Sequence, residues 1–189
     1  ERACKLSVEI GGGSITALPI ATTQDGNISA YIPTNLISIT DGQIFLDADL
    51  FNQGQKPAID IGQSVSRVGS FAQQPAMRNL VGNLKLELSQ FEEVEHFTRF
   101  GTEVDRATRL QIDKGKRILE TLKQKPNQPL SFPMTIVILF ALNKGFMGNV
   151  LIGEIQSYQK ELREYFSRKE PKLLNDINQE GRFTEEIIN

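Results

Sequence analysis

The sequence has 189 residues, with 21 Lys and Arg against 23 Asp and Glu and a formal net charge of −2. This length suffices for one domain or two small ones, and the balanced charge argues against nucleic-acid binding, because no overall basic field would gather phosphates. A single cysteine, Cys4, excludes an internal disulfide framework, and the single histidine, His96, has the charged neighbours typical of a solvated helix face.

The first part of the sequence predicts β-strands. Short β-rich runs lie at residues 14–20, 27–32, 43–46 and 58–61, separated by the turn-forming runs G-G-G, D-G-N, T-D-G and N-Q-G-Q-K-P. The run T-N-L-I-S-I-T at residues 34–40 fits a short helix or a loop, because seven residues are too few for periodicity to decide. This pattern is typical of the strand-rich end of an α/β sheet.

From Pro75 onward the hydrophobic period becomes helical. One apolar face predicts a helix to about Phe100, ended by Gly101, and consists of Leu80, Leu84, Leu88 and Phe91. A second helix is predicted over residues 103–124, with an outward face formed by Asp113, Lys114, Lys116 and Arg117 and an inward face formed by Leu110, Ile118, Leu119 and Leu122.

Further helices are predicted at residues 133–142 and 150–166, followed by two short helical pieces. The apolar run at residues 134–142 is nine residues long, about half of what a bilayer core requires, and therefore predicts a buried helix. Short connections favour antiparallel packing, so residues 74–189 are expected to form a helical bundle.

No self-sufficient active site emerges from the motifs. The phosphate-binding pattern G-x-x-x-x-G-K-[ST] is absent, and the G-G-G-S run at residues 11–14 leads into a predicted strand and favours a turn. His and Cys are too few for a metal centre, so no metal ligand is assigned. Paired carboxylates occur only in the runs at residues 92–93 and 185–186, which are typical of helix surfaces.

Arg67 is the remaining candidate, in the run S-V-S-R-V-G at residues 64–69. It ends the last β-rich run before the helices, and ligands of open α/β sheets gather at the carboxyl ends of strands. An arginine suits phosphate because its planar fork donates several hydrogen bonds and stays charged when desolvated. Residue type alone leaves two interpretations open, a structural ion pair and a group that faces a phosphate.

Three longer runs resemble the alpha subunit of F1-type ATP synthases. They are G-G-G-S-I-T-A-L-P at residues 11–19, S-A-Y-I-P-T-N-L-I-S-I-T-D-G-Q-I-F-L at 29–46 and S-V-S-R-V-G-S at 64–70. The runs E-R-A-C-K-L-S, A-D-L-F-N and K-L-E-L-S-Q-F are more similar to the chloroplast form. The resemblance covers only the C-terminal part of that subunit, and the sequence starts without Met, as expected of a piece of a longer polypeptide.

The resemblance implies an α+β fold in two parts. Residues 1–73 would complete a P-loop-type α/β nucleotide-binding domain whose P-loop half is absent here, and residues 74–189 would form an all-α helical domain. In this family, alpha and beta subunits alternate around a gamma shaft, and ATP forms mainly on beta. Arg67 matches the arginine that alpha supplies to that site, where such fingers stabilise charge on the γ-phosphoryl group.

The resemblance also implies nucleotide contacts. Ser38 matches a serine near the same phosphate, although its hydroxyl equally fits a turn or helix cap. The base of a non-catalytic ATP or ADP would lie near Phe51, Lys56, Pro57 and Gln124, with the phosphate and Mg²⁺ ligands outside this sequence. The family usually has Arg where Lys56 stands, and a second glutamine where this sequence has Pro126.

Two hypotheses follow for the function. In the first, the protein belongs to a proton-translocating rotary ATP synthase, peripheral on the stromal face of the chloroplast thylakoid membrane, with the mitochondrial inner membrane and the bacterial plasma membrane as alternatives. In the second, a split or decayed alpha fragment only packs in the hexamer. Departures such as F-P-M-T-I-V at residues 132–137 and K-G-F-M-G at 144–148 motivate this alternative. We expect no ATPase activity from the protein alone.

Overall fold

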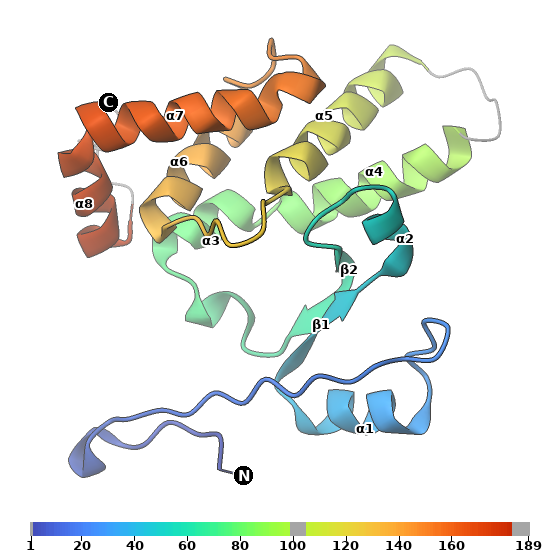
Figure 1. Cartoon of the computed structure of the whole chain (residues 1–189), viewed down its shortest axis with the longest axis vertical. Helices are drawn as coiled ribbons and strands as arrows, with labels where there is room; N and C mark the ends of the chain where they lie inside the picture. The colour runs from blue at the N-terminus through green and yellow to red at the C-terminus, as the bar shows by residue number, and fades with distance from the viewer. Residues whose placement is uncertain (1, 99–104, 183–189) are drawn as a thin grey trace. The chain divides into compact units, whose positions relative to one another are not determined.

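The structure is a computed structural model that describes residues 2–98 and 105–182 (Figure 1). The protein divides into two units, Glu1–Thr40 and Asp41–Asn189, and each is described by itself. The expected features at Phe100, Gly101, Glu103 and the 185–186 carboxylates lie outside the described residues.

The first unit contains a 3₁₀ turn, η1 (Val8–Ile10), and one helix, α1 (Tyr31–Ile39). The expectation of strands at residues 14–20 and 27–32 is wrong, since strand-like pairing in the described residues 2–40 is limited to a bridge between Lys5 and Ser14. A strand needs a hydrogen-bonded neighbour, and Leu18 and Ile20 are instead 81% and 95% exposed. Of the run at residues 34–40, which fitted either a helix or a loop, residues 34–39 belong to α1 and Thr40 caps its end.

The second unit begins with an antiparallel pair, β1 (Gly42–Leu46) and β2 (Ile59–Ser66), joined through a short helix, α2 (Ala48–Asn52). Both strands were expected, but β2 continues further than predicted, to Ser66. The pairing shifts register between Gln43 and Phe45, where the Phe45 amide donates to the Ser64 hydroxyl at 3.0 Å. That hydroxyl in turn donates to the Asp60 carbonyl at 2.5 Å, so a side chain fills the gap in the ladder.

The remainder of the second unit is helical, which confirms the expected α+β character. The elements, in sequence order, are η2 (Gly69–Ala72), α3 (Pro75–Val81), α4 (Leu84–Thr98), α5 (Arg106–Leu122), α6 (Phe132–Asn143), η3 (Ile152–Glu154), α7 (Ile155–Lys169) and α8 (Pro171–Glu180). In Figure 1 the β1–β2 pair lies beside α4, with which β2 is in contact.

The helix expected to start at Pro75 is interrupted between α3 and α4. Gly82 and Asn83 stand at the break, and both residue types are poor helix formers. The Leu80 carbonyl accepts a hydrogen bond from the Asn143 side chain at 2.8 Å, which replaces a helical partner. The expected apolar face survives the break, since Leu80, Leu88 and Phe91 are buried.

Helix α6 forms the centre of the hydrophobic core. Its buried side chains are Met134, Ile136, Val137, Ile138, Leu139 and Ala141. Helices α3, α7 and α8 contact it from different directions, which explains why α6 is apolar on all sides. Within the described part of the protein, no helix combines the length and the hydrophobicity that a membrane crossing requires.

Helices α4 and α5 approach each other closely. A Cβ atom added to the buried Gly115 of α5 would lie 2.1 Å from Cγ of Phe91 on α4, so a glycine is required there. Nearby, the Lys114 ammonium and the Glu87 carboxylate are 2.7 Å apart. The expectation that Ile118 points inward is confirmed, but Leu110 is wrongly predicted, because it is 65% exposed near the start of α5.

Arg117 also departs from its expected outward position. Its side chain is only 15% exposed and pairs with Asp113 at 2.8 Å. The guanidinium donates to the Met147 carbonyl at 2.8 Å and to the Val150 carbonyl. These bonds connect α5 to the segment between α6 and α7, and α7 begins at Ile155 rather than near Val150 as expected.

Candidate functional site

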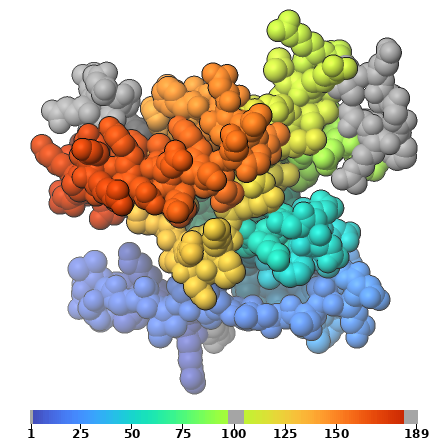
Figure 2. Space-filling view, turned by 45° about the horizontal axis from the view of Figure 1, so that its top comes forward, coloured from blue at the N-terminus to red at the C-terminus, as the bar shows by residue number. Residues whose placement is uncertain are grey.

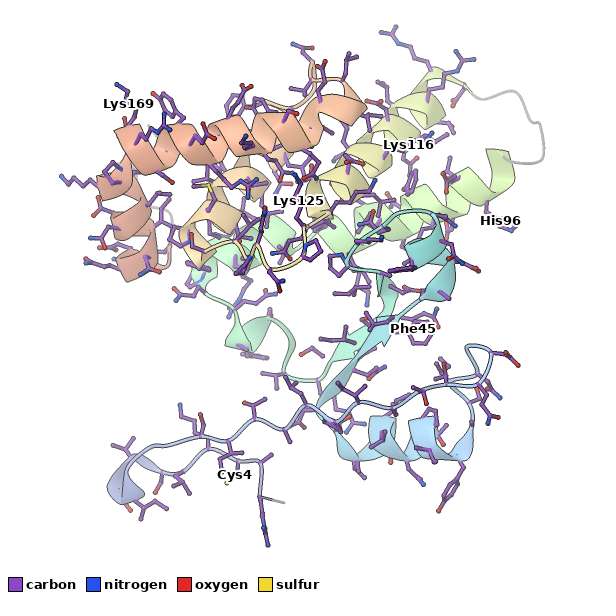
Figure 3. The ribbon with its side chains drawn as sticks, viewed as in Figure 1. Cys4, Phe45, His96, Lys116, Lys125 and Lys169 are labelled. Atoms are coloured by element: carbon purple, nitrogen blue, oxygen red, sulfur yellow. The ribbon has the colours of Figure 1, made fainter. Side chains whose placement is uncertain are left out.

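Four of the predicted nucleotide-contacting residues gather around one open pocket in the second unit. Phe51, Lys56, Pro57 and Gln124 all line this pocket, whose volume is about 770 Å³. The other lining residues are Leu46, Asp47, Ala48, Ala58, Lys125, Pro126, Asn127, Gln128 and Pro129. Figure 3 labels Lys125 in the segment that follows α5, and Figure 2 shows that segment beside the α2 region.

The pocket is assembled from two loops far apart in the sequence. On one side, the Asp47 carboxylate caps α2 by accepting from the Leu50 amide at 2.8 Å, which orients Phe51. On the other side, α5 ends at Leu122 and the backbone turns through Lys123. The two sides are joined where the Gln124 amide donates to the Lys56 carbonyl at 2.7 Å.

A second contact between these loops comes from Gln55, which is 9% exposed. Its side-chain amide donates to the Leu119 carbonyl on α5 at 3.2 Å. The Lys56–Pro57 peptide bond that follows is cis. The wall that carries Phe51, Lys56 and Pro57 is therefore attached to α5 by both backbone and side chain.

The chemistry of the pocket suits a flat, partly polar ring. Its walls are largely apolar and include the Phe51 ring, over which the Lys56 ammonium lies at 4.6 Å from the ring centroid. The Gln124 side chain supplies an amide group and donates to the Gln128 carbonyl at 3.1 Å. Apolar walls with a few polar groups are typical of small-molecule sites.

Asp47, Asn127 and Gln128 also line the pocket, although they were not predicted from the sequence. The available signal was the run K-P-N-Q-P at residues 125–129, because two prolines close together restrict a connection between helices. Asn127 adopts a positive φ of 57°, a conformation that asparagine tolerates better than most residues. The family resemblance implies a second glutamine at the position that Pro126 occupies here. Gln128, two residues further along, lines the pocket.

Arg67 lies outside the residues that line this pocket, in an exposed turn directly after β2. Its backbone amide donates to the Asp41 carbonyl at 2.8 Å, which extends the β1–β2 pairing by one step. Gly69 follows with a positive φ of 59°, and its amide donates to the Ser66 hydroxyl at 3.1 Å. The last strand before the helices therefore ends at Ser66, one residue before Arg67, rather than at Arg67 as the sequence suggested.

Ser38 belongs to the first unit, near the end of α1. Its hydroxyl donates to the Asn35 carbonyl at 2.7 Å, as a serine in the last turn of a helix commonly does. This contact lies within the helix, and a contact between the Ser38 hydroxyl and a phosphate stays a prediction.

The titratable groups provide no second site in the described residues. Cys4 is exposed, as is His96, which Figure 3 labels on α4. Partial burial raises the pKa of the Glu92 carboxyl above its ordinary value of 4.5, and the charges of Asp60 and Glu95 raise it further. Within residues 2–98 and 105–182, no group of three His, Cys, Asp or Glu side chains is placed to hold a metal ion.

The two sides of the pocket correspond to two family models. The nucleotide-binding domain of the ATP synthase alpha/beta family matches residues 1–66, and the C-terminal domain of the ATP synthase alpha/beta chain matches residues 73–189. The protein belongs to the ATP synthase alpha/beta family. The pocket of this family member takes Phe51, Lys56 and Pro57 from the first matched region and Gln124 from the second.

Individual relatives agree with the family match. The ATP synthase subunit alpha of Lawsonia intracellularis is 48% identical over 187 residues, which cover 99% of this protein and 37% of the relative. The ATP synthase subunit alpha of Latilactobacillus sakei is 53% identical over 179 residues, covering 95% and 35% respectively. That of Aquifex aeolicus is 47% identical over 187 residues, covering 99% and 37%. The sequence therefore spans just over a third of the length of these bacterial relatives.

Proposed function

We propose that the protein is the C-terminal part of an F1-type ATP synthase alpha subunit and supplies Arg67 in trans to the catalytic site of a neighbouring beta subunit. The observation that carries the proposal is the position of Arg67 in an exposed turn directly after β2, in a sequence that aligns over 99% of its length with an ATP synthase subunit alpha. An arginine in an exposed turn at a strand end can be presented to a phosphate on a partner.

The proposed role of Arg67 is electrostatic. Phosphoryl transfer spreads negative charge over the oxygens of the transferred group, and a guanidinium brought to them stabilises the transition state more than the bound nucleotide. The catalytic base and the phosphate loop would be those of beta. We propose a minor role for Ser38, which would reach the phosphate only if its hydroxyl gave up the Asn35 carbonyl.

The pocket at Phe51, Lys56, Pro57 and Gln124 is proposed to hold the base of a non-catalytic ATP or ADP. Support comes from the Phe51 ring in the pocket wall, the amide of Gln124 and the family match on both sides of the pocket. As the family resemblance implies, the residues that hold Mg²⁺ and the phosphates would lie outside this sequence.

The proposed assembly is an alternating ring of alpha and beta subunits around a gamma shaft, coupled to proton transport, in which residues 1–73 complete the nucleotide-binding domain and residues 74–189 form the helical domain. The complex would be peripheral to an energy-converting membrane. The bacterial relatives favour the plasma membrane, and the runs of chloroplast type favour the thylakoid. Cell fractionation of the source organism distinguishes these locations.

The experiment is an Arg67→Ala substitution in the full-length subunit, assembled with beta and gamma. Steady-state ATP hydrolysis is expected to fall on the order of 10³-fold, while nucleotide still binds. Arg67→Lys keeps the charge without the planar fork and is expected to restore little of the rate. Arg109→Ala, at an exposed arginine of α5, is the matched control and should leave turnover unchanged.

Near-normal turnover in the assembled Arg67→Ala complex would contradict the proposal. That result favours the second hypothesis, in which the fragment only packs in the hexamer. Failure of both Arg67→Ala and Arg109→Ala complexes to assemble would point to a packing defect, which size-exclusion chromatography of each complex detects before any rate is measured.

A further inference from the structure

Two cationic side chains of the helical region bind the backbone on either side of Arg67. The Arg78 guanidinium on α3 donates to the Ser70 carbonyl through Nε at 3.0 Å and through Nη2 at 2.6 Å. The Lys85 ammonium on α4 donates to the Ser64 carbonyl at 3.1 Å. Ser64 and Ser70 stand three residues before and three residues after Arg67.

These bonds lie in exposed positions, and they are charge-assisted, which strengthens them over neutral hydrogen bonds to the same carbonyls. They act on a segment that also has local contacts, from the Arg67 amide to the Asp41 carbonyl and from the Gly69 amide to the Ser66 hydroxyl. The local contacts shape the turn, whereas Arg78 and Lys85 fix that turn relative to α3 and α4.

Helix α3 is itself anchored at its first turn, which makes it a firm support for Arg78. The Ala76 amide, which has no partner within the helix at this position, donates to the Gly181 carbonyl at the end of α8 at 3.0 Å. Ala76 is 1% exposed and belongs to the core around α6. The support for the turn therefore reaches into the hydrophobic core.

We infer that Arg78 and Lys85 form a two-point clamp that positions Arg67 for the neighbouring catalytic site. The inference rests on the proposed function of Arg67 and adds two positioning residues to it. Neither side chain is assigned a contact with nucleotide. The clamp matters because a shift of about 1 Å in a catalytic group lowers rates by up to about 100-fold.

The test uses Arg78→Gln and Lys85→Gln, singly and together, in the full-length subunit assembled with beta and gamma. Each single variant is expected to lower kcat for ATP hydrolysis about tenfold, and the double variant about 100-fold. The KM for ATP should stay within about twofold, since the clamp does not bind substrate. Arg78→Lys and Lys85→Arg keep a donor at each point and should recover most of the rate.

Hydrogen exchange of the peptide that covers residues 64–70 supplies a readout independent of catalysis. In the assembled complex, the Gln variants should exchange this peptide several-fold faster, while Arg109→Gln, on α5, should leave both exchange and turnover unchanged. Unchanged exchange in the double variant overturns the clamp itself.

The failure of the clamp and the failure of the proposed function give different results. If Arg67→Ala loses turnover and the double Gln variant keeps it, the inference is overturned and the function of Arg67 stands. If Arg67→Ala keeps turnover, the proposed function is overturned, and the positioning role of Arg78 and Lys85 with it.

Discussion

Lys56 and Phe51 share one wall of the pocket, with the ammonium over the ring face. A family arginine at this position would offer a planar group that stacks and donates in fixed directions, whereas lysine offers a compact charge. The aromatic ring is therefore the larger flat surface on this wall for the nucleotide base that we propose binds here. A single substitution of Phe51 can measure how much the ring contributes to nucleotide binding.

Phe51→Ala is expected to weaken nucleotide binding to the full-length subunit about 5- to 150-fold, because stacking of a base on an aromatic ring contributes about 1–3 kcal/mol. Equilibrium titration with a fluorescent ADP analogue measures the Kd. Phe146→Ala is the control, because Phe146 is also an exposed phenylalanine, 64% accessible, but does not line the pocket. Equal affinities of parent and Phe51→Ala proteins would remove Phe51 from the site.

At the scale of elements, the contact between α4 and α5 depends on the absence of a side chain at Gly115. The ring of Phe91 occupies the space that a Cβ would take, and Phe91 is 2% exposed, so it has no route to solvent. In the sequence this glycine stands between two lysines and predicts only a solvated stretch of helix. A glycine inside a long helix lowers helix propensity, and here the packing explains its presence.

Gly115→Ala is expected to destabilise the protein by about 2 kcal/mol, because the close approach to Phe91 puts overpacking near the upper end of its usual cost of about 1–3 kcal/mol and the better helix propensity of alanine offsets about 1 kcal/mol. Urea unfolding followed by circular dichroism measures the free energy of unfolding. Gly153→Ala serves as the control, since an added Cβ there meets nothing within 4 Å, and it should be neutral or slightly stabilising. A stabilising Gly115→Ala would show that the two helices separate easily.

Arg117 and Leu110 illustrate a limit of helical periodicity. The apolar period predicts the helix α5 itself. It places Arg117 outward because it is charged and Leu110 inward because it is apolar, and both placements are wrong. Leu110 lies in the first turns of α5, where it stays 65% exposed, and Arg117 is buried because two loop carbonyls need a donor. Neither of these two carbonyls is near Arg117 in the sequence, so no local pattern contains this information.

For the whole molecule, the junction between β2 and α4 carries an unfavourable charge pattern. Burial first, and then the carboxylates of Asp60 and Glu95, raise the pKa of Glu92 in the folded protein. In the unfolded state Glu92 titrates near its ordinary value of 4.5. The folded state therefore holds this proton more firmly than the unfolded state does, and stability falls as pH rises from about 4.5 through the raised folded pKa.

The substitution Glu92→Gln should remove this loss of stability at higher pH. Its Tm is expected to equal that of the parent below about pH 4.5 and to exceed it above the raised pKa, because the variant has no charge to be desolvated or to repel Asp60. Thermal unfolding at a series of pH values gives the comparison. Glu93→Gln, the adjacent carboxyl on α4, is expected to leave the pH dependence in place. A constant difference between Glu92→Gln and the parent at all pH values would contradict the assignment.

Much of the fold could be predicted from the sequence, because the helical half repeats apolar residues at a regular period. The strands expected at residues 14–20 and 27–32 failed for a physical reason, since β-rich composition does not supply the neighbouring strand that a ladder requires. The pocket residues Phe51, Lys56 and Gln124 came only from the family resemblance. Composition and spacing contain no sign that residues so far apart in sequence share one pocket, and the contact that joins them is a backbone hydrogen bond.

That backbone bond, from the Gln124 amide to the Lys56 carbonyl, connects the regions matched by two different family models. A ligand in the pocket would touch both sides and act as a removable cross-link between them. Mass action then adds to the stability of the junction by about 2.7 kcal/mol when free ligand is at about 100 times its Kd. The cohesion of the two regions would in that case follow the nucleotide concentration of the cell.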